Sequence, residues 1–183
     1  MKGTIYLFVA EGTEEVEALA IVDVIRRAGL AVRIISITGN ALVTSSHGVR
    51  LYADGVFEEE KFDDVAMLVL PGGMPGSTNL AAHAGLCELI KHHAATATPL
   101  AAICAAPLVY GRLGVLEGRR ATCYPGFEPE LRGAVCTGAL VERDGNIFTG
   151  RGPAAAFPLG FAIVEHFLGT EKVNAMKASM QFC

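Results

Sequence analysis

The sequence predicts an α/β sandwich of the flavodoxin type, in which a mostly parallel sheet is covered by helices on both faces. Short apolar runs alternate with helical patterns along the whole chain. The chain opens with a strand, a helix and a second strand, which is the unit that builds a parallel sheet. Hydrophobic residues make up 51% of the 183 residues, and the mean hydropathy of +0.40 fits a sheet that is buried on both faces.

The first three elements are the clearest. An apolar run at 4–9 predicts a strand, and the wide apolar face of 14–28 predicts a helix. We expect Thr13 to cap this helix, because threonine is a favoured N-cap residue. Acidic residues in the first turn and arginines in the last turn match the helix dipole. A second strand is expected at 31–37.

The remainder of the chain continues this alternation. Further strands are expected at 41–44, 49–52, 66–70, 99–103, 120–123, 134–137, 140–142 and 147–149. Further helices are expected at 79–93, from Pro107 to about 113, at 154–168 and at 171–178. Since the sequence contains no internal repeat, linker or low-complexity segment, we expect a single domain over residues 1–183.

Composition excludes several classes of function. The net charge is −4 and the basic residues are scattered, so nucleic-acid binding is not favoured. The apolar runs are too short to cross a membrane, and the N-terminus does not have the pattern of a signal peptide. The five cysteines include no CxxC pair, which argues against zinc and dithiol sites. Free thiols indicate a cytoplasmic location, and we expect no metal or cofactor.

Cys104 is the strongest candidate for a chemically active residue. The strand at 99–103 runs directly into this cysteine, and Ala105, Ala106 and Pro107 begin a helix. A residue at such an elbow is held in a strained turn with its side chain exposed. The adjacent helix N-terminus stabilises the thiolate, which is the nucleophilic form. The alternative is a buried structural cysteine, since free cysteines are among the most buried residues.

Two further features follow other predicted elements. Gly72 and Gly73 come after the strand at 66–70, where glycines let backbone N–H groups approach an oxyanion; an ordinary tight turn is the simpler interpretation. Glu17 lies among apolar residues of the first helix. A desolvated carboxyl there stays protonated and can donate a hydrogen bond to a thiolate. The alternative is a solvated partner of the helix dipole, as for other acids of the first turn.

These three features occur together, and in this order, in one known family. The sequence resembles the ThiJ/PfpI (DJ-one) superfamily along nearly its whole length. The matching stretches are Glu11–Glu17, Val22–Gly29, Leu70–Gly73, Ala101–Pro107 and Gly150–Pro153. The chain is most similar to the subgroup of the parkinsonism-associated protein deglycase and its bacterial YajL-like relatives. Ala105 stands where the protease-like and glyoxalase III-like branches have histidine.

The resemblance implies a role for each candidate residue. Cys104 is expected to be the reactive, oxidation-sensitive thiol, and Glu17 is expected to be its protonated hydrogen-bond partner. The backbone N–H groups of Gly73 and Ala105 are expected to hold an oxyanion or a cysteine sulfinate. The resemblance also implies a homodimer that has the first helix at its interface.

Two positions depart from the pattern of the subgroup. Tyr124 stands where its members often have histidine, and His47 stands where they often have arginine. A phenol donates a hydrogen bond but is a poor base near neutral pH. We expect His47, Tyr124 and Arg151 to line the pocket, with His47 reaching it across the dimer. The alternative for His47 is a solvated loop histidine, and the two replacements leave the identity of the substrate open.

The implied activity is that of a cysteine-dependent glyoxalase or protein deglycase, a stress-response enzyme acting on reactive dicarbonyls or their protein adducts. The alternative is a non-enzymatic redox sensor or redox-dependent chaperone that is switched by oxidation of Cys104. An amidotransferase-like hydrolase is disfavoured, because no histidine stands beside the elbow. The expected partners are small reactive carbonyls, glycated proteins and a second copy of the chain.

Overall fold

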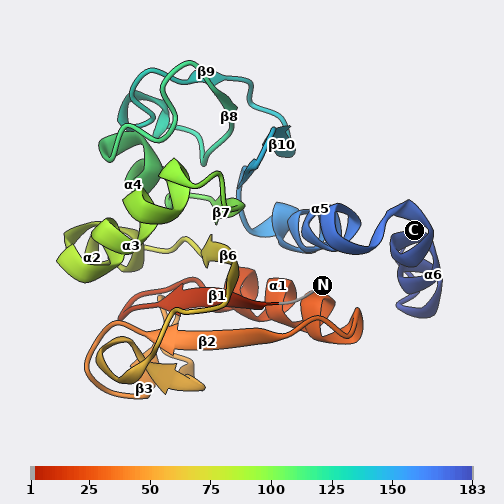
Figure 1. Ribbon diagram of the computed structural model, residues 1–183, viewed down its shortest axis with the longest axis horizontal. Helices are drawn as coiled ribbons and strands as arrows, with labels where there is room; N and C mark the ends of the chain where they lie inside the picture. The colour runs from red at the N-terminus through yellow and green to blue at the C-terminus, as the bar shows by residue number, and fades with distance from the viewer. Residues whose placement is uncertain (1–2, 183) are drawn as a thin grey trace.

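A seven-stranded sheet forms the centre of the protein in the computed structural model, which describes residues 3–182 (Figure 1). Neighbouring strands are parallel, except for one antiparallel hairpin at the edge, so the predicted mostly parallel sheet is confirmed. In order across the sheet, the strands are β10 (Val141–Asp144), β11 (Ile147–Gly150), β7 (Leu100–Ile103), β6 (Val65–Leu70), β1 (Thr4–Val9), β2 (Val32–Ser36) and β5 (Gly55–Val56).

Helices cover both faces of this sheet. One face is covered by α1 (Glu15–Arg27), α5 (Ala156–Leu168) and α6 (Thr170–Ser179). The other is covered by α2 (Gly76–Ala82), α3 (Ala84–Ala95) and α4 (Pro107–Arg112). Successive side chains of a strand point to opposite faces, so the continuous apolar run of β1 contributes to two cores. Leu7 packs in the core under α1, whereas Phe8 packs in the core under α3.

Four short strands lie outside the central sheet. The antiparallel pair is β3 (Leu42–Thr44) with β4 (Arg50–Tyr52), and the parallel pair is β8 (Arg120–Ala121) with β9 (Val135–Cys136). Short 3₁₀ turns occupy Phe57–Glu59, Glu128–Glu130 and Pro153–Ala155. The ends of the predicted elements agree with the structure to within about two residues, with one exception among the helices.

The single helix predicted at 79–93 is wrong. The chain forms α2 and α3 instead, which meet at His83 in an extended conformation with ψ of 103°. The Nδ1 atom of His83 accepts a hydrogen bond from the N–H of Leu86 at 3.0 Å. His83 is therefore the N-cap of α3 and not a surface helix residue, and its side chain is only 20% exposed. Apolar residues recur at helical spacing on both sides of His83, so the sequence pattern does not show that one helix ends and another begins there.

The predicted cap of α1 is also wrong. Glu14 occupies the N-cap position, and no side chain caps the helix. Thr13 is fully buried, and its hydroxyl accepts a hydrogen bond from the N–H of Ala10 at 2.9 Å, which closes the turn after β1. The N–H of Glu14 donates to the carbonyl of Gly72 at 2.9 Å. The start of α1 is thereby joined to the loop that follows β6.

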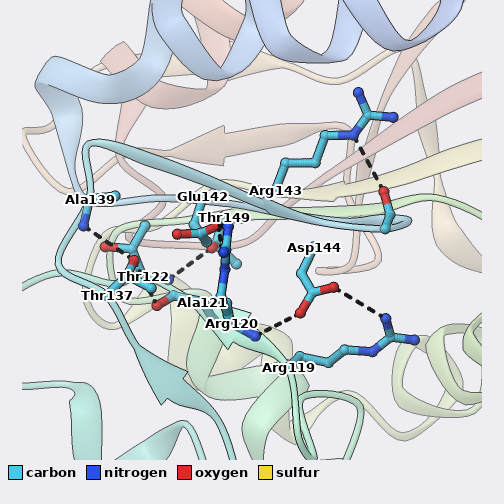
Figure 2. Close-up of polar contacts among 11 residues, drawn as sticks. Arg119, Arg120, Ala121, Thr122, Thr137, Ala139, Glu142, Arg143, Asp144 and Thr149 are labelled. Carbon is cyan, nitrogen blue, oxygen red and sulfur yellow. Dashed lines mark hydrogen bonds and ion pairs between the residues drawn. The ribbon is translucent and has the colours of Figure 1, made fainter.

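Ion pairs and hydrogen bonds join β8 to the edge hairpin (Figure 2). The Arg120 guanidinium lies 2.6 Å from Glu142 Oε1, and the backbone N–H of Arg120 donates to Asp144 Oδ2 at 2.8 Å. Farther along, the N–H of Thr122 donates to the hydroxyl of Thr149 at 2.9 Å. These contacts hold the segment that precedes Tyr124 against β11.

Candidate active site

Cys104 lies at the carboxyl end of β7, in the turn that leads to α4. Its φ of +62° is in the left-handed region, so the strained turn predicted from the sequence is confirmed. The N–H of Cys104 donates to the carbonyl of Gly150 at 2.9 Å, and its carbonyl accepts from the N–H of Tyr124 at 2.8 Å. These hydrogen bonds hold the elbow to β11 on one side and to the Tyr124 segment on the other.

Glu17 is a fully buried carboxyl group on the first turns of α1. The N–H of Gly72 donates to its Oε2 atom at 2.7 Å, whereas Oε1 makes no hydrogen bond within residues 3–182. Burial raises the pKa of Glu17 to about 7, although the hydrogen bonds from Gly72 and Cys104 act in the opposite direction. The predicted desolvation of this carboxyl is confirmed.

Gly72 lies between the two candidate side chains. A Cβ atom at this position would lie 2.6 Å from Cys104 Cβ and 2.7 Å from Glu17 Oε2. Both distances are far below van der Waals contact, so only glycine fits here. Because the loop after β6 passes between α1 and the elbow, the three features predicted from separate parts of the sequence lie together at the carboxyl edge of the sheet.

The thiol of Cys104 and the carboxyl of Glu17 form a coupled acid pair. Burial and the neighbouring Glu17 raise the pKa of the Cys104 thiol, whereas the N–H groups of Ala105 and Gly73 lower it. The pair therefore loses one proton near neutral pH and holds the second much more strongly.

The side chain of Cys104 is not exposed, contrary to the prediction from the sequence. The residue is half-buried, because the loop containing Gly72 packs against it.

Two of the three predicted pocket residues lie beside this elbow. Tyr124 and Arg151 line a cavity of about 350 Å³ whose remaining walls are mostly apolar. Tyr124 donates its N–H to the Cys104 carbonyl, and Arg151 directly follows Gly150, which accepts the N–H of Cys104. The backbone of the elbow and the wall of the cavity are thus hydrogen-bonded to each other.

The third predicted pocket residue, His47, lies elsewhere within the chain. Its side chain is 67% exposed, and its Nδ1 atom lies 3.1 Å from Glu15 Oε1 and 3.5 Å from Glu14 Oε2. The three ligand atoms lie within 4.8 Å of one another, a spacing that a metal ion also requires. The ion pair explains this arrangement, and we assign no metal to it.

The carboxylates beside His47 determine how it titrates. The hydrogen bond that His47 donates to Glu15 and the charges of Glu14 and Glu15 raise the pKa of His47 above its usual value of 6.5. If His47 acts on the site across a dimer, the pH profile of activity has a step above pH 6.5 that is absent in His47→Arg, since arginine does not titrate there. Measuring the pH profiles of both proteins tests this, and identical profiles would leave His47 without a role.

The hydrogen bond from Gly72 to Glu17 was not predicted from the sequence. The glycine pair was expected to supply backbone donors, but the donor role was expected of Gly73 alone. The missing information is the packing of α1 against the loop after β6, which joins residues 55 positions apart. The partners of the Cys104 peptide, Gly150 and Tyr124, were missed for the same reason. Local sequence carries no signal for such pairings.

Known proteins are similar to this chain in sequence and in fold. A model of the DJ-1/PfpI family matches residues 3–166. The chain is 39% identical over 168 residues to Protein DJ-1 homolog B of Arabidopsis thaliana, covering 90% of this chain and 38% of that protein. It is 29% identical over 181 residues to Glutathione-independent glyoxalase DJR-1.2 of Caenorhabditis elegans, covering 96% of this chain and 94% of that protein.

Solved structures of DJ-1 proteins are also similar to this chain. Oxidized DJ-1 of Toxoplasma gondii superposes with a TM-score of 0.94 at 30% identity, over 99% of both chains. This similarity confirms the flavodoxin-like α/β fold. The chain spans less than half the length of the Arabidopsis relatives, at 38% and 45% of two such proteins. The family match covers most of the sequence, so the protein belongs to the DJ-1/PfpI family.

Proposed function

We propose that the protein is a cysteine-dependent glyoxalase that acts on α-oxoaldehydes such as methylglyoxal, or on their adducts with proteins as a deglycase. The observation that carries this proposal is the buried Glu17 carboxyl coupled to the Cys104 thiol, beside the N–H groups of Gly73 and Ala105. The Caenorhabditis elegans relative is named as a glutathione-independent glyoxalase, which supports the substrate class.

The first step of the proposed reaction is addition. The thiolate of Cys104 attacks the aldehyde carbon, and a C–S bond forms while the carbonyl electrons move to oxygen. The N–H groups of Gly73 and Ala105 stabilise the resulting oxyanion. Glu17 donates its proton to this oxygen, which gives a neutral hemithioacetal and leaves Glu17 as a carboxylate.

The second step is a proton shift that releases the product. The Glu17 carboxylate removes the proton from the carbon bound to sulfur, which forms an enediolate. The hydroxyl proton on this carbon's oxygen moves to the neighbouring oxygen, and Glu17 returns its own proton to the neighbouring carbon. The result is a thioester of lactate when the substrate is methylglyoxal. Water hydrolyses this thioester to lactate and restores the thiol. Atoms and electrons balance without an external oxidant or reductant. Oε1 of Glu17 makes no hydrogen bond within residues 3–182 and is free to carry this proton.

Turnover by the purified protein tests the proposed function. The protein is incubated with methylglyoxal in the absence of glutathione or any added cofactor, and lactate is measured by proton nuclear magnetic resonance. We expect lactate to accumulate in molar excess over the protein. If methylglyoxal is consumed only in stoichiometric amounts, the protein is modified by this aldehyde and does not turn it over.

A redox role is the second candidate, and one observation favours it. Gly73 and Ala105 direct their N–H groups at a half-buried sulfur, and the same donors suit the two oxygens of a sulfinate. A sensor or chaperone of this kind would respond to peroxide treatment. If such treatment creates chaperone activity in a protein that never forms lactate, the redox role is the correct one.

We also propose that the protein is a homodimer formed through α1. Val16 is 51% exposed on this helix, and it lines a shallow apolar cavity together with Leu19 and Phe157. Apolar side chains that a helix leaves exposed beside an apolar cavity are typical of an interface. The hairpin of β3 and β4 exposes Tyr52 as well, which adds to the apolar surface of the protein.

Replacing Val16 with aspartate is expected to convert the dimer to a monomer, because a charge in an apolar interface is left without a partner. Light scattering coupled to size-exclusion chromatography gives the mass. The matched control is Val135→Asp, since Val135 is 59% exposed on β9. A wild-type protein that elutes as a monomer would contradict the proposal.

The cytoplasmic location expected from the sequence is also a proposal. Within residues 3–182, no helix has the length and apolar character needed to cross a membrane. Four cysteines in this range are free thiols, as is usual for proteins of a reducing compartment.

A further inference from the structure

We propose that the cavity beside Cys104 selects substrates that carry a carboxylate in addition to the reactive carbonyl group. Arg151 and Tyr124 are the specificity-determining residues in this proposal, which rests on the proposed function for the reaction itself. The substrate class is an α-oxoaldehyde whose side chain ends in a carboxylate.

The cavity is positioned by the backbone of the elbow. Arg151 follows Gly150, which accepts the Cys104 N–H, and the N–H of Arg151 donates to the carbonyl of Leu140 at 2.9 Å. Tyr124 is fixed by its hydrogen bond to the carbonyl of Cys104. Two walls of this cavity are therefore hydrogen-bonded, directly or through the preceding residue, to the peptide groups of Cys104, although Cys104 itself is not among the lining residues.

The charge of the cavity is positive. Arg151 is exposed and makes no ion pair with any residue in the range 3–182, and none of the described residues that line the cavity is acidic. Most other arginines are paired with a carboxylate; these are Arg26, Arg27, Arg33, Arg112, Arg119 and Arg120. In a chain with a net charge of −4, an unpaired guanidinium at the wall of a cavity favours an anionic ligand.

Tyr124 supplies the second donor. Its side chain is 47% exposed, and a Cβ atom on Gly152 would lie 3.2 Å from the Cδ2 atom of its ring. The ring therefore lies against the backbone of the segment that carries Arg151. A phenol hydroxyl donates a hydrogen bond to a carboxylate but does not act as a base near neutral pH. Tyrosine at this position thus suits binding and not proton transfer.

The other walls define the size and polarity of the substrate. Pro125, Leu140 and Pro153 present apolar groups, and the volume of about 350 Å³ is that of a small-molecule site. A short alkyl chain fits these walls, while its terminal carboxylate reaches the guanidinium. Methylglyoxal has no carboxylate that could form an ion pair with Arg151.

Alkylation of Cys104 tests the charge preference without any turnover. Iodoacetate and iodoacetamide are similar in size and differ in charge, so the ratio of their rates reports the local potential. We expect Arg151→Gln to lower the ratio of the iodoacetate rate to the iodoacetamide rate by about threefold, as one partly exposed charge allows. The control is Arg132→Gln, because Arg132 is exposed and does not line the cavity. An equal ratio in wild type and Arg151→Gln would overturn the proposal.

A pair of substrates tests the class directly. γ,δ-Dioxovalerate is an α-oxoaldehyde with a terminal carboxylate, and its methyl ester is the neutral analogue. We expect wild type to prefer the acid in kcat/KM, and Arg151→Gln to lose about tenfold of that preference. Tyr124→Phe is expected to lose a smaller part of the preference for the acid, since only one hydrogen bond to the carboxylate is removed. Equal kcat/KM for acid and ester in wild type would overturn the proposal. If neither compound is turned over, the proposed function fails, and the alkylation ratio still decides the charge preference.

Discussion

Replacing Cys104 with serine is expected to lower the turnover of methylglyoxal by a factor on the order of 10³ or more. A serine hydroxyl fits the same half-buried position, but its pKa lies far above that of a thiol. Neither the N–H groups of Gly73 and Ala105 nor a carboxyl with a pKa of about 7 can then generate the nucleophile near neutral pH. The fold is expected to survive, because the side chain changes by a single atom.

The measurement is kcat/KM from lactate formation, together with the thermal unfolding midpoint of each protein. Cys87→Ser is the matched control, since Cys87 is also half-buried and lies on α3 on the other face of the sheet. Its activity should equal that of wild type. A Cys104→Ser protein that retains more than about a tenth of the activity would show that another residue is the nucleophile.

Replacing Glu17 with glutamine is expected to lower turnover by about 10²- to 10⁴-fold, the usual range for loss of a general acid and base. Glutamine keeps a hydrogen-bond donor beside the sulfur but has no proton to transfer. The alkylation rate of Cys104 should therefore be retained while catalysis fails. Asp23→Asn is the control on the same helix, where the exposed side chain pairs with Arg27. Full activity in Glu17→Gln would reduce Glu17 to a packing residue.

The same variant has a second expected effect, on stability. The pKa of Glu17 is raised from 4.5 to about 7 in the folded protein, so the unfolded chain releases this proton first as the pH rises. The free energy of unfolding therefore falls between pH 4.5 and 7, by up to about 3 kcal/mol. In Glu17→Gln this fall should be absent. The free energy of unfolding of the variant, measured relative to that of wild type, should therefore be higher at pH 8 than at pH 5. Thermal unfolding of both proteins at the two pH values measures the difference.

The sequence was sufficient to predict the elbow and six of the seven strands of the central sheet, but not the short edge strand β5. Strands such as 4–9 and 66–70 are continuous apolar runs, and the step from strand to cysteine to helix at Cys104 is a local pattern. The burial of Glu17 was also predictable, because its neighbours in the helix are apolar. These features depend on residues close in sequence, where spacing determines which side chains are buried.

Features that depend on tertiary contacts were not predictable. The break between α2 and α3 depends on the side chain of His83, which caps α3. The hydroxyl of Thr13 accepts a hydrogen bond from the loop after β1 and does not cap α1. The half-burial of Cys104 depends on a loop that starts more than 30 residues earlier, at Gly72. His47 was expected near the reactive cysteine across a dimer, whereas within one chain its partners are Glu14 and Glu15. Each of these outcomes depends on which distant segment packs nearby.

The position of the proton shared by Cys104 and Glu17 decides whether this site is nucleophilic, and the order of cysteine alkylation measures it. Iodoacetamide labelling at neutral pH is mapped by mass spectrometry. Cys183 lies outside the described residues and is first replaced by serine. With the proton on Glu17, the charge lies on the sulfur. Cys104 then reacts before Cys87, Cys123 and the exposed Cys136, and its rate rises through a transition near pH 7. If instead Cys136 reacts first and Cys104 responds only at strongly alkaline pH, the charge lies on Glu17 and the proposed nucleophile does not exist.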